Sequence, residues 1–173
     1  MKQARLIAMA GLPGSRKSTI AEALSHRLPA VILSVDPIEA ALRRSGLPKR
    51  QIGRAGYEVA GVLAVENLKR GHSVIIDAVN PVQEARNMWT QMAEAMTAQL
   101  VFIEVVCSDE TEHRQRIDAR VRGIAGLTEV SWARVLDRMQ DYEPWAMPRL
   151  VLDTANTDLN ALVRHALETL QQD

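Results

Sequence analysis

The sequence predicts a three-layer α/β/α fold, in which a parallel sheet of five strands lies between two layers of helices. Five short runs of the chain are almost wholly apolar, and such runs are typical of strands that are covered on both faces. Amphipathic segments of helical length separate these runs, and this alternation favours right-handed βαβ crossovers. A glycine-rich loop, "GLPGSRKST", follows the first apolar run and leads directly into a helical segment.

Each element is predicted from its apolar pattern and its flanking residues. The expected strands are 5–10, 30–35, 73–78, 99–106 and 149–154. The expected helices are 18–28, 37–45, 56–70, 81–96, 110–121, 129–142 and 158–170. Asp36 and Asn80 each precede a proline, and a capping residue followed by proline marks the start of a helix. Two segments that mix glycine with arginine, 44–56 and 120–130, are predicted to be mobile inserts.

The composition excludes several classes of protein. With 173 residues the chain suits one compact domain, expected to cover 1–173. The 21 basic and 21 acidic residues balance and only 3% of residues are aromatic, which disfavours nucleic acid as a partner. Cys107 is the one cysteine, so the chain holds no disulfide framework. The apolar N-terminal stretch is too short for a signal peptide or a membrane-spanning helix, which indicates a soluble, cytoplasmic protein.

The glycine-rich loop carries the strongest chemical signal. Against the phosphate-binding pattern G-x-x-x-x-G-K-[ST], it matches at Gly11, Lys17 and Ser18, and it departs at Arg16, where the pattern has glycine. Backbone N–H groups of such a loop surround phosphates together with the N-terminus of the following helix. Lys17 would reach the β- and γ-phosphates and Ser18 would ligate Mg²⁺, so ATP and Mg²⁺ are the expected cofactors.

Arg16 is expected to weaken or reshape this site without abolishing it. If the backbone at this position is left-handed, a residue other than glycine costs roughly 1–2 kcal/mol. Several charge-assisted hydrogen bonds to phosphate, each worth about 1.5–3 kcal/mol, would offset that cost. We expect the guanidinium to point away from the phosphates, toward solvent or a nearby carboxylate.

Four motifs occur in a characteristic order: "GLPGSRKST", "LSVDPIEAAL", "VIIDAVNPVQEAR" and "HRQRIDARVRG". In this order they resemble the small P-loop kinases of the AAA-family ATPase-like group, which includes polynucleotide kinase, chloramphenicol phosphotransferase, zeta toxins and gluconate kinase. The resemblance implies a P-loop NTPase fold with strand order 2-3-1-4-5, and a lid that closes over the phosphates. The ATP contacts that it implies in the loop are Gly11, Pro13, Gly14, Ser15, Arg16, Lys17, Ser18 and Thr19.

Acidic residues follow the second and third strands, at the edge where ligands of open α/β sheets bind. Asp36 would orient or deprotonate an acceptor hydroxyl, the role of the matching aspartate in the family, and it could also cap the next helix. Asp77 would act on Mg²⁺ or, by the resemblance, hold the acceptor. Asn80 is predicted either to bond the substrate or to cap a helix. Arg86 is a further acceptor contact that the resemblance suggests.

Arg116, Arg120 and Arg122 are predicted to belong to a lid at about 114–128. Lid arginines neutralise the charge that spreads over the oxygens of a transferred phosphoryl group. Arg120 is predicted to be catalytic, and Arg116 and Arg122 to contact the nucleotide; the alternative is a solvated basic helix face. The four histidines, His113 among them, lie far apart and are expected at the surface rather than as metal ligands.

These features predict an enzyme that transfers the γ-phosphoryl group of ATP to a hydroxyl of an unidentified small molecule, with Lys17, Asp36 and Arg120 as catalytic residues. Glu39 stands where polynucleotide kinases carry an arginine, which disfavours a polynucleotide acceptor. The alternative is a nucleotide-binding regulatory protein or a weak nucleoside triphosphatase whose loop Arg16 has impaired. Carboxylates at the active edge favour the enzyme. The sequence names neither the acceptor nor an oligomeric state.

Overall fold

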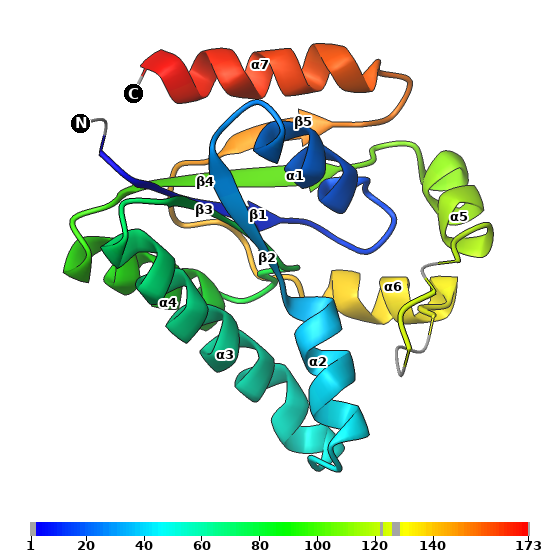
Figure 1. The fold of residues 1–173 in the computed structure, drawn as a ribbon. Helices are drawn as coiled ribbons and strands as arrows, with labels where there is room; N and C mark the ends of the chain where they lie inside the picture. Colours follow the sequence, from blue (N-terminus) through cyan, green and yellow to red (C-terminus); the bar gives the residue numbers. More distant parts are fainter. Residues whose placement is uncertain (1–2, 122, 126–128, 173) are drawn as a thin grey trace.

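Five parallel strands form the centre of the computed structural model, in the order β2-β3-β1-β4-β5 (Figure 1). The strands are β1 Arg5–Ala10, β2 Ala30–Ser34, β3 Ser73–Asp77, β4 Gln99–Val106 and β5 Leu150–Asp153. The predicted sheet and its strand order are therefore confirmed. The structure describes residues 3–121, 123–125 and 129–172.

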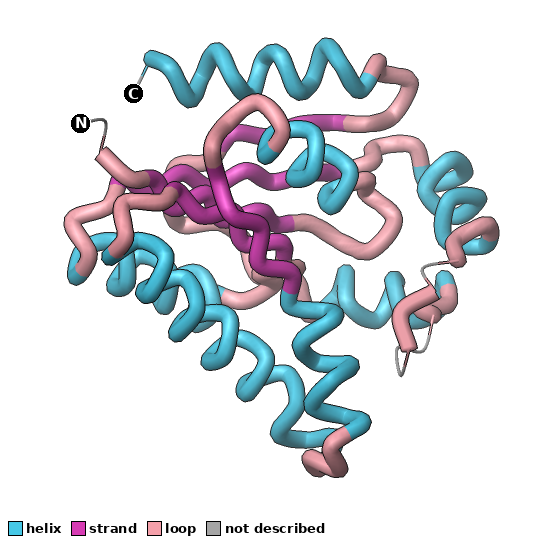
Figure 2. Tube along the Cα trace, viewed as in Figure 1, coloured by secondary structure: helices cyan, strands magenta, loops and turns pink. Residues whose placement is uncertain are grey.

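Helices cover both faces of the sheet, which gives the predicted three layers (Figure 2). They are α1 Lys17–Ser25, α2 Val35–Arg44, α3 Lys49–Lys69, α4 Gln83–Ala95, α5 Glu110–Asp118, α6 Trp132–Gln140 and α7 Leu159–Gln172. Alternating residues of β1 point to opposite layers. Ile7 and Met9 pack in one apolar cluster with α1 and α7, whereas Leu6 and Ala8 pack in a second cluster with α3 and α4. All four side chains are fully buried, so β1 contributes to both halves of the core.

The predicted mobile insert 44–56 is wrong over most of its length, because α3 begins at Lys49 and includes two of the three glycines of that segment, Gly53 and Gly56. The buried positions of α3 recur mostly at intervals of four. They are Ile52, Gly56, Ala60, Gly61, Ala64 and Leu68. At Gly56 an added Cβ would lie 2.8 Å from Cγ of Glu39 in α2, so the missing side chain lets the two helices approach closely. Tertiary packing thus overrides the low helix propensity of glycine.

Two helices begin at other residues than predicted. α2 begins at Val35, so Ser34 holds the N-cap position and Asp36 lies within the first turn, where Pro37 is also tolerated. α4 begins at Gln83, after Asn80, whose φ of 48° is left-handed. Neither Asp36 nor Asn80 is therefore an N-cap. In the lid region α5 ends at 118 and α6 begins at 132, and the described residues between them form neither helix nor strand.

The carboxyl ends of three strands meet at one edge of the sheet. Asp77 at the end of β3 pairs in register with Ser34 of β2 and with Met9 of β1. The glycine-rich loop leaves β1 at this edge. Both chain termini lie at the opposite edge (Figure 1). Within the residues described, no helix combines the length and the apolar character needed to cross a membrane.

Gly53→Ala and Gly56→Ala should separate two roles of glycine in α3. Gly53 is exposed and an added Cβ would lie 4.0 Å from Oε1 of Glu39, so alanine should raise the free energy of unfolding by up to about 1 kcal/mol through helix propensity. At Gly56 the contact with Cγ of Glu39 opposes this gain, and we expect a loss of about 1 kcal/mol. Urea unfolding measures both, and an equal gain at the two positions would contradict the close approach of α2 and α3.

Candidate functional site

The loop between β1 and α1 turns sharply at Pro13 and Gly14. The N–H of Ser15 donates to the carbonyl of Leu12 at 3.3 Å, and Gly14 has a φ of 86°. A proline at the second position and a positive φ at the third define a type II turn. The turn brings the chain back over the start of α1.

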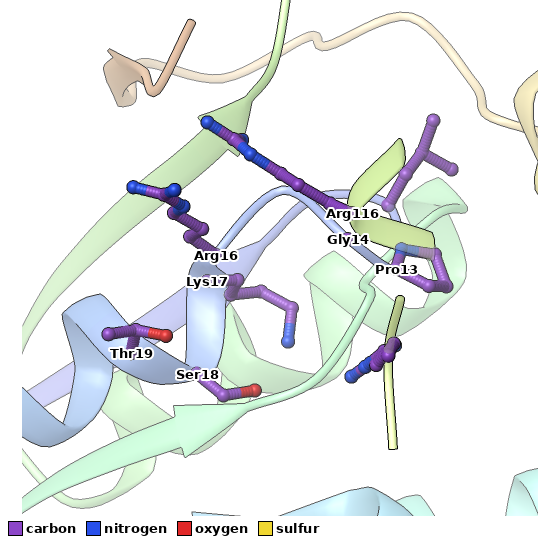
Figure 3. Close-up of a pocket in the computed structure, with 9 residues that line it drawn as sticks. Pro13, Gly14, Arg16, Lys17, Ser18, Thr19 and Arg116 are labelled. Atoms are coloured by element: carbon purple, nitrogen blue, oxygen red, sulfur yellow. The ribbon is translucent and has the colours of Figure 1, made fainter. Parts of the chain in front are cut away.

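Two other loop positions have left-handed or related backbone conformations. Gly11 has a φ of 129°, and an added Cβ would lie 2.1 Å from the carbonyl oxygen of Val105, so only glycine fits. Arg16, at the N-cap of α1, has φ 66° and ψ 17°, so the expected cost of roughly 1–2 kcal/mol for a residue other than glycine applies. Its side chain is exposed and diverges from that of Lys17 (Figure 3). The guanidinium therefore leaves the space beside the Lys17 ammonium open.

Backbone N–H groups gather along this loop without acceptors. In the described part of the chain, no atom accepts from the N–H groups of Gly14, Arg16, Lys17, Ser18 or Thr19. Unpaired amides at a helix start, together with the positive end of the helix dipole, form a binding site for anions. The loop therefore has the donors that a chain of phosphates requires.

A pocket of about 270 Å³ lies over these amides (Figure 3). It is lined by Leu12, Pro13, Gly14, Arg16, Lys17, Ser18, Thr19, Arg116 and Arg120. The structure thus brings six predicted loop residues together with two predicted lid arginines. Gly11 and Ser15 are buried and lie outside this lining. Arg122 lies outside the described residues.

Lys17 and Asp77 form a buried ion pair at the sheet edge. Ser34 donates from Oγ to the other carboxylate oxygen of Asp77 at 3.0 Å. Burial by itself raises the pKa of Asp77, but the charge of Lys17 and hydrogen bonds from Lys17, Ser18 and Ser34 outweigh burial, so the pKa is lowered. Asp77 is therefore a carboxylate at neutral pH.

These side chains fit a Mg²⁺ ion that binds together with nucleotide phosphates. Mg²⁺ prefers oxygen ligands and keeps few protein contacts when phosphates supply the rest. The Ser18 hydroxyl and the Asp77 carboxylate are oxygen donors on the same side of the loop. They would hold the ion, which would neutralise phosphate charge when bound.

Asp36 and Glu39 lie one turn apart in α2, beside the same sheet edge. Burial raises the pKa of Glu39 and the charge of Asp36 raises it further, whereas Arg138 and Arg43 lower it. Arg138 belongs to α6, so charges from both α2 and α6 act on the carboxyl group of Glu39. Asp36 lies in the first turn of α2, directly after β2, and its predicted role toward an acceptor stays a prediction.

The structure corrects the predicted substrate contact of Asn80. This side chain is fully buried, and its Nδ2 donates to the carbonyl of Met9 at 2.7 Å. Its Oδ1 accepts from Nε1 of Trp89 at 2.8 Å. Asn80 therefore fixes the end of β1 to the chain after β3, and both ends of its amide are used within the protein.

Arg86 is likewise corrected from a substrate contact to a buried structural residue. Its guanidinium is fully buried and lies 3.9 Å from the ring centroid of Trp145. It donates to the carbonyl oxygens of Asn80, Pro81, Glu143 and Pro144. These contacts join the turn after β3 to the segment after α6 and leave the side chain no access to a ligand.

The two predicted lid arginines that the structure describes, Arg116 and Arg120, have different surroundings. Arg116 donates to both Oγ1 and the carbonyl of Thr154 at 2.7 Å, so the loop after β5 fixes it beside the pocket. It also pairs with Glu112 one turn earlier. Arg120 follows the end of α5 and lines the pocket. The predicted lid role of both residues stays a prediction.

Two residues that contact the loop from behind were not predicted. His113 was expected at the surface, but it is 3% exposed and its Nε2 lies 2.7 Å from the carbonyl oxygen of Pro13. Thr154, 1% exposed, directs its hydroxyl toward the carbonyl of Ser15 at 3.2 Å. The four-residue spacing of His113 and buried Ile117 was the available signal, since it places both on one face of a helix.

Comparison with known proteins agrees with this geometry. A family model described as an AAA domain matches residues 6–144. A protein from Chloroflexus aurantiacus, provisionally described as a kinase, is 21% identical, with a TM-score of 0.76 over 96% of this chain and 98% of that chain.

Two further structures carry the names of specific kinases. A gluconokinase from Sinorhizobium meliloti is 17% identical, with a TM-score of 0.73 over 99% of this chain and 94% of its own. The APS kinase of Mycobacterium tuberculosis, in complex with AMPPNP and APS, is 17% identical, with a TM-score of 0.70 over 99% of each chain. These likenesses show that the chain has the α/β fold of the P-loop NTPases.

Arg16→Gly should stabilise the ligand-free protein. Glycine removes the left-handed strain but adds freedom to the unfolded chain, so we expect the free energy of unfolding to rise by about 1 kcal/mol. Arg16→Ala keeps a Cβ in the same conformation and serves as the matched control. If urea unfolding gave the alanine variant the same gain, backbone strain at this position would not be its source.

Asp77→Asn should remove a pH-dependent part of the stability. The lowered pKa of Asp77 means that its stabilising effect is complete above the unfolded-state value of about 3.9 and is lost as the pH falls through the native value. The difference in free energy of unfolding between wild type and variant should therefore shrink below roughly pH 4. Urea unfolding along a pH series measures this difference, which should not stay constant into strong acid.

Proposed function

Since the chain belongs to this AAA domain family, we propose that it is an ATP- and Mg²⁺-dependent kinase that transfers the γ-phosphoryl group to a hydroxyl of a small molecule. One observation carries the proposal. Unpaired amides of the loop, the Lys17 ammonium and the Asp77 carboxylate meet at one edge of the sheet, and α2, which contains Asp36, begins at the same edge. The kinases among the solved structures of the same fold support it.

The loop amides would bind the phosphates, and Lys17 would exchange its contact with Asp77 for the β- and γ-phosphates. Ser18 and Asp77 would hold Mg²⁺. Arg116 and Arg120, which line the same pocket, would neutralise charge on the transferred group. Together these contacts would position the γ-phosphoryl group toward α2.

Asp36 would orient the acceptor hydroxyl and take its proton as the oxygen attacks phosphorus. The residue one turn after Asp36 bears on the class of acceptor. Glu39 is a second acidic group near Asp36; burial and the charge of Asp36 raise its pKa, whereas the charges of Arg138 and Arg43 lower it. Because polynucleotide kinases carry an arginine at the position of Glu39, we propose a small hydroxyl compound rather than a polynucleotide as the acceptor.

Calorimetric titration with MgATP and with a non-hydrolysable analogue tests the nucleotide site. Both should bind, because the unpaired amides do not depend on hydrolysis. No heat at roughly millimolar nucleotide would refute the proposal. Binding without phosphoryl transfer, in a screen over sugars, nucleosides, aminoglycosides and related antibiotics, would favour the regulatory protein. Nucleotide hydrolysis alone would favour the triphosphatase.

Asp36→Asn should lower kcat for phosphoryl transfer by at least about a hundredfold, because the amide cannot accept the proton. The affinity for MgATP should stay unchanged, since Asp36 lies in α2 and outside the nucleotide pocket. Glu39→Gln is the matched control on the same helix, and it should alter KM for the acceptor more than kcat. Equal loss of kcat in the two variants would argue against Asp36 as the base.

A further inference from the structure

The phosphate-binding loop is held from its outer side by a buried imidazole. His113 of α5 reaches the carbonyl oxygen of Pro13 at 2.7 Å, across 100 positions of sequence. A carbonyl oxygen only accepts, so Nε2 of His113 carries the proton and donates it. The ring is 3% exposed, so the bond lies in the protein interior.

This bond fixes the peptide unit on which the turn depends. In a type II turn the peptide between the second and third residues can rotate toward type I, and Pro13 is compatible with both forms. Gly14 has no Cβ to oppose the rotation. A trans peptide directs its C=O and N–H to opposite sides. When His113 holds the Pro13 carbonyl outside the loop, the Gly14 N–H therefore points inward.

Other contacts place His113 firmly against the loop. An added Cβ at Gly14 would lie 2.8 Å from Cδ1 of Ile117 and 3.0 Å from Cδ2 of His113, so α5 packs directly on the turn. The His113 ring also meets Trp132, the first residue of α6, edge to face at 5.2 Å. Thr154 adds a weaker outer contact, because its hydroxyl proton is shared between the carbonyls of Ser15 and Val106.

We infer that His113 is a positioning residue of the nucleotide site, which keeps the Gly14 amide turned toward the phosphates before any nucleotide binds. The inference rests on the proposed nucleotide site, but it concerns the free loop as well. A preformed anion site binds more tightly because binding does not have to order it. His113 touches no reacting atom, and it acts only through the peptide between Pro13 and Gly14.

His113→Gln, His113→Asn and His113→Leu test this role. The amide N–H of glutamine can reach the position of Nε2, whereas asparagine is too short and leucine has no donor. We expect the leucine and asparagine variants to bind MgATP about three- to tenfold more weakly by calorimetry, and the glutamine variant to stay within about twofold of wild type. Val163→Ala, at a buried position of α7, is the control for general destabilisation.

Amide hydrogen exchange of the ligand-free protein provides a readout that needs no nucleotide. The N–H groups of Gly11 and Ser15, which donate to the carbonyls of Val79 and Leu12, should exchange about three- to tenfold faster in His113→Leu than in wild type. Their exchange should be unchanged in Val163→Ala. Equal exchange and equal affinity in wild type and His113→Leu would overturn the inference, as would loss of affinity in Val163→Ala to the same degree. If wild type bound no MgATP, the proposed function would fail, and the exchange comparison would still decide the role of His113.

Discussion

Unpaired backbone amides between β1 and α1 are the constraint on which the rest of the site depends. Such amides are costly unless a ligand or water accepts from them, so the chain around them must be fixed by other means. The N–H of Gly11 donates to the carbonyl of Val79 at 3.1 Å, and Asn80 holds Met9 just before the loop. The carbonyls of Pro13 and Ser15 accept hydrogen bonds from His113 and Thr154, whereas N–H groups of the loop remain available on the pocket side.

Two buried cations are stabilised in different ways, and the difference matches their positions. Lys17 pairs with a carboxylate beside the pocket, where a phosphate can take its place. Arg86 lies away from the pocket, and carbonyl oxygens and aromatic rings surround its guanidinium. A cation bound this way has no rival partner, so it suits a permanent joint between the turn after β3 and the chain after α6.

The sequence was most informative where structure depends on neighbours in the chain. Apolar runs predicted all five strands, and the pattern around Lys17 predicted the loop, because both signals are local. The burial of Arg86 and His113 is not predicted from the sequence, because partners of both lie far away along the chain. Arg86 donates to the carbonyl of Glu143, 57 positions away, and His113 to that of Pro13, 100 positions away. Their roles depend on which backbone carbonyls the fold brings near, and no local pattern records that. The start of α3 was missed for the same reason, since Gly56 is favoured only by its packing on α2.

The chain ends and the pocket lie at opposite edges of the sheet (Figure 1). Every parallel strand points its carboxyl end toward the pocket, and α7 returns the chain to the other side. A tether attached at either end would therefore leave the loop facing solvent. The molecule could be immobilised on a surface, or joined to a second domain, with its binding edge still open to small molecules.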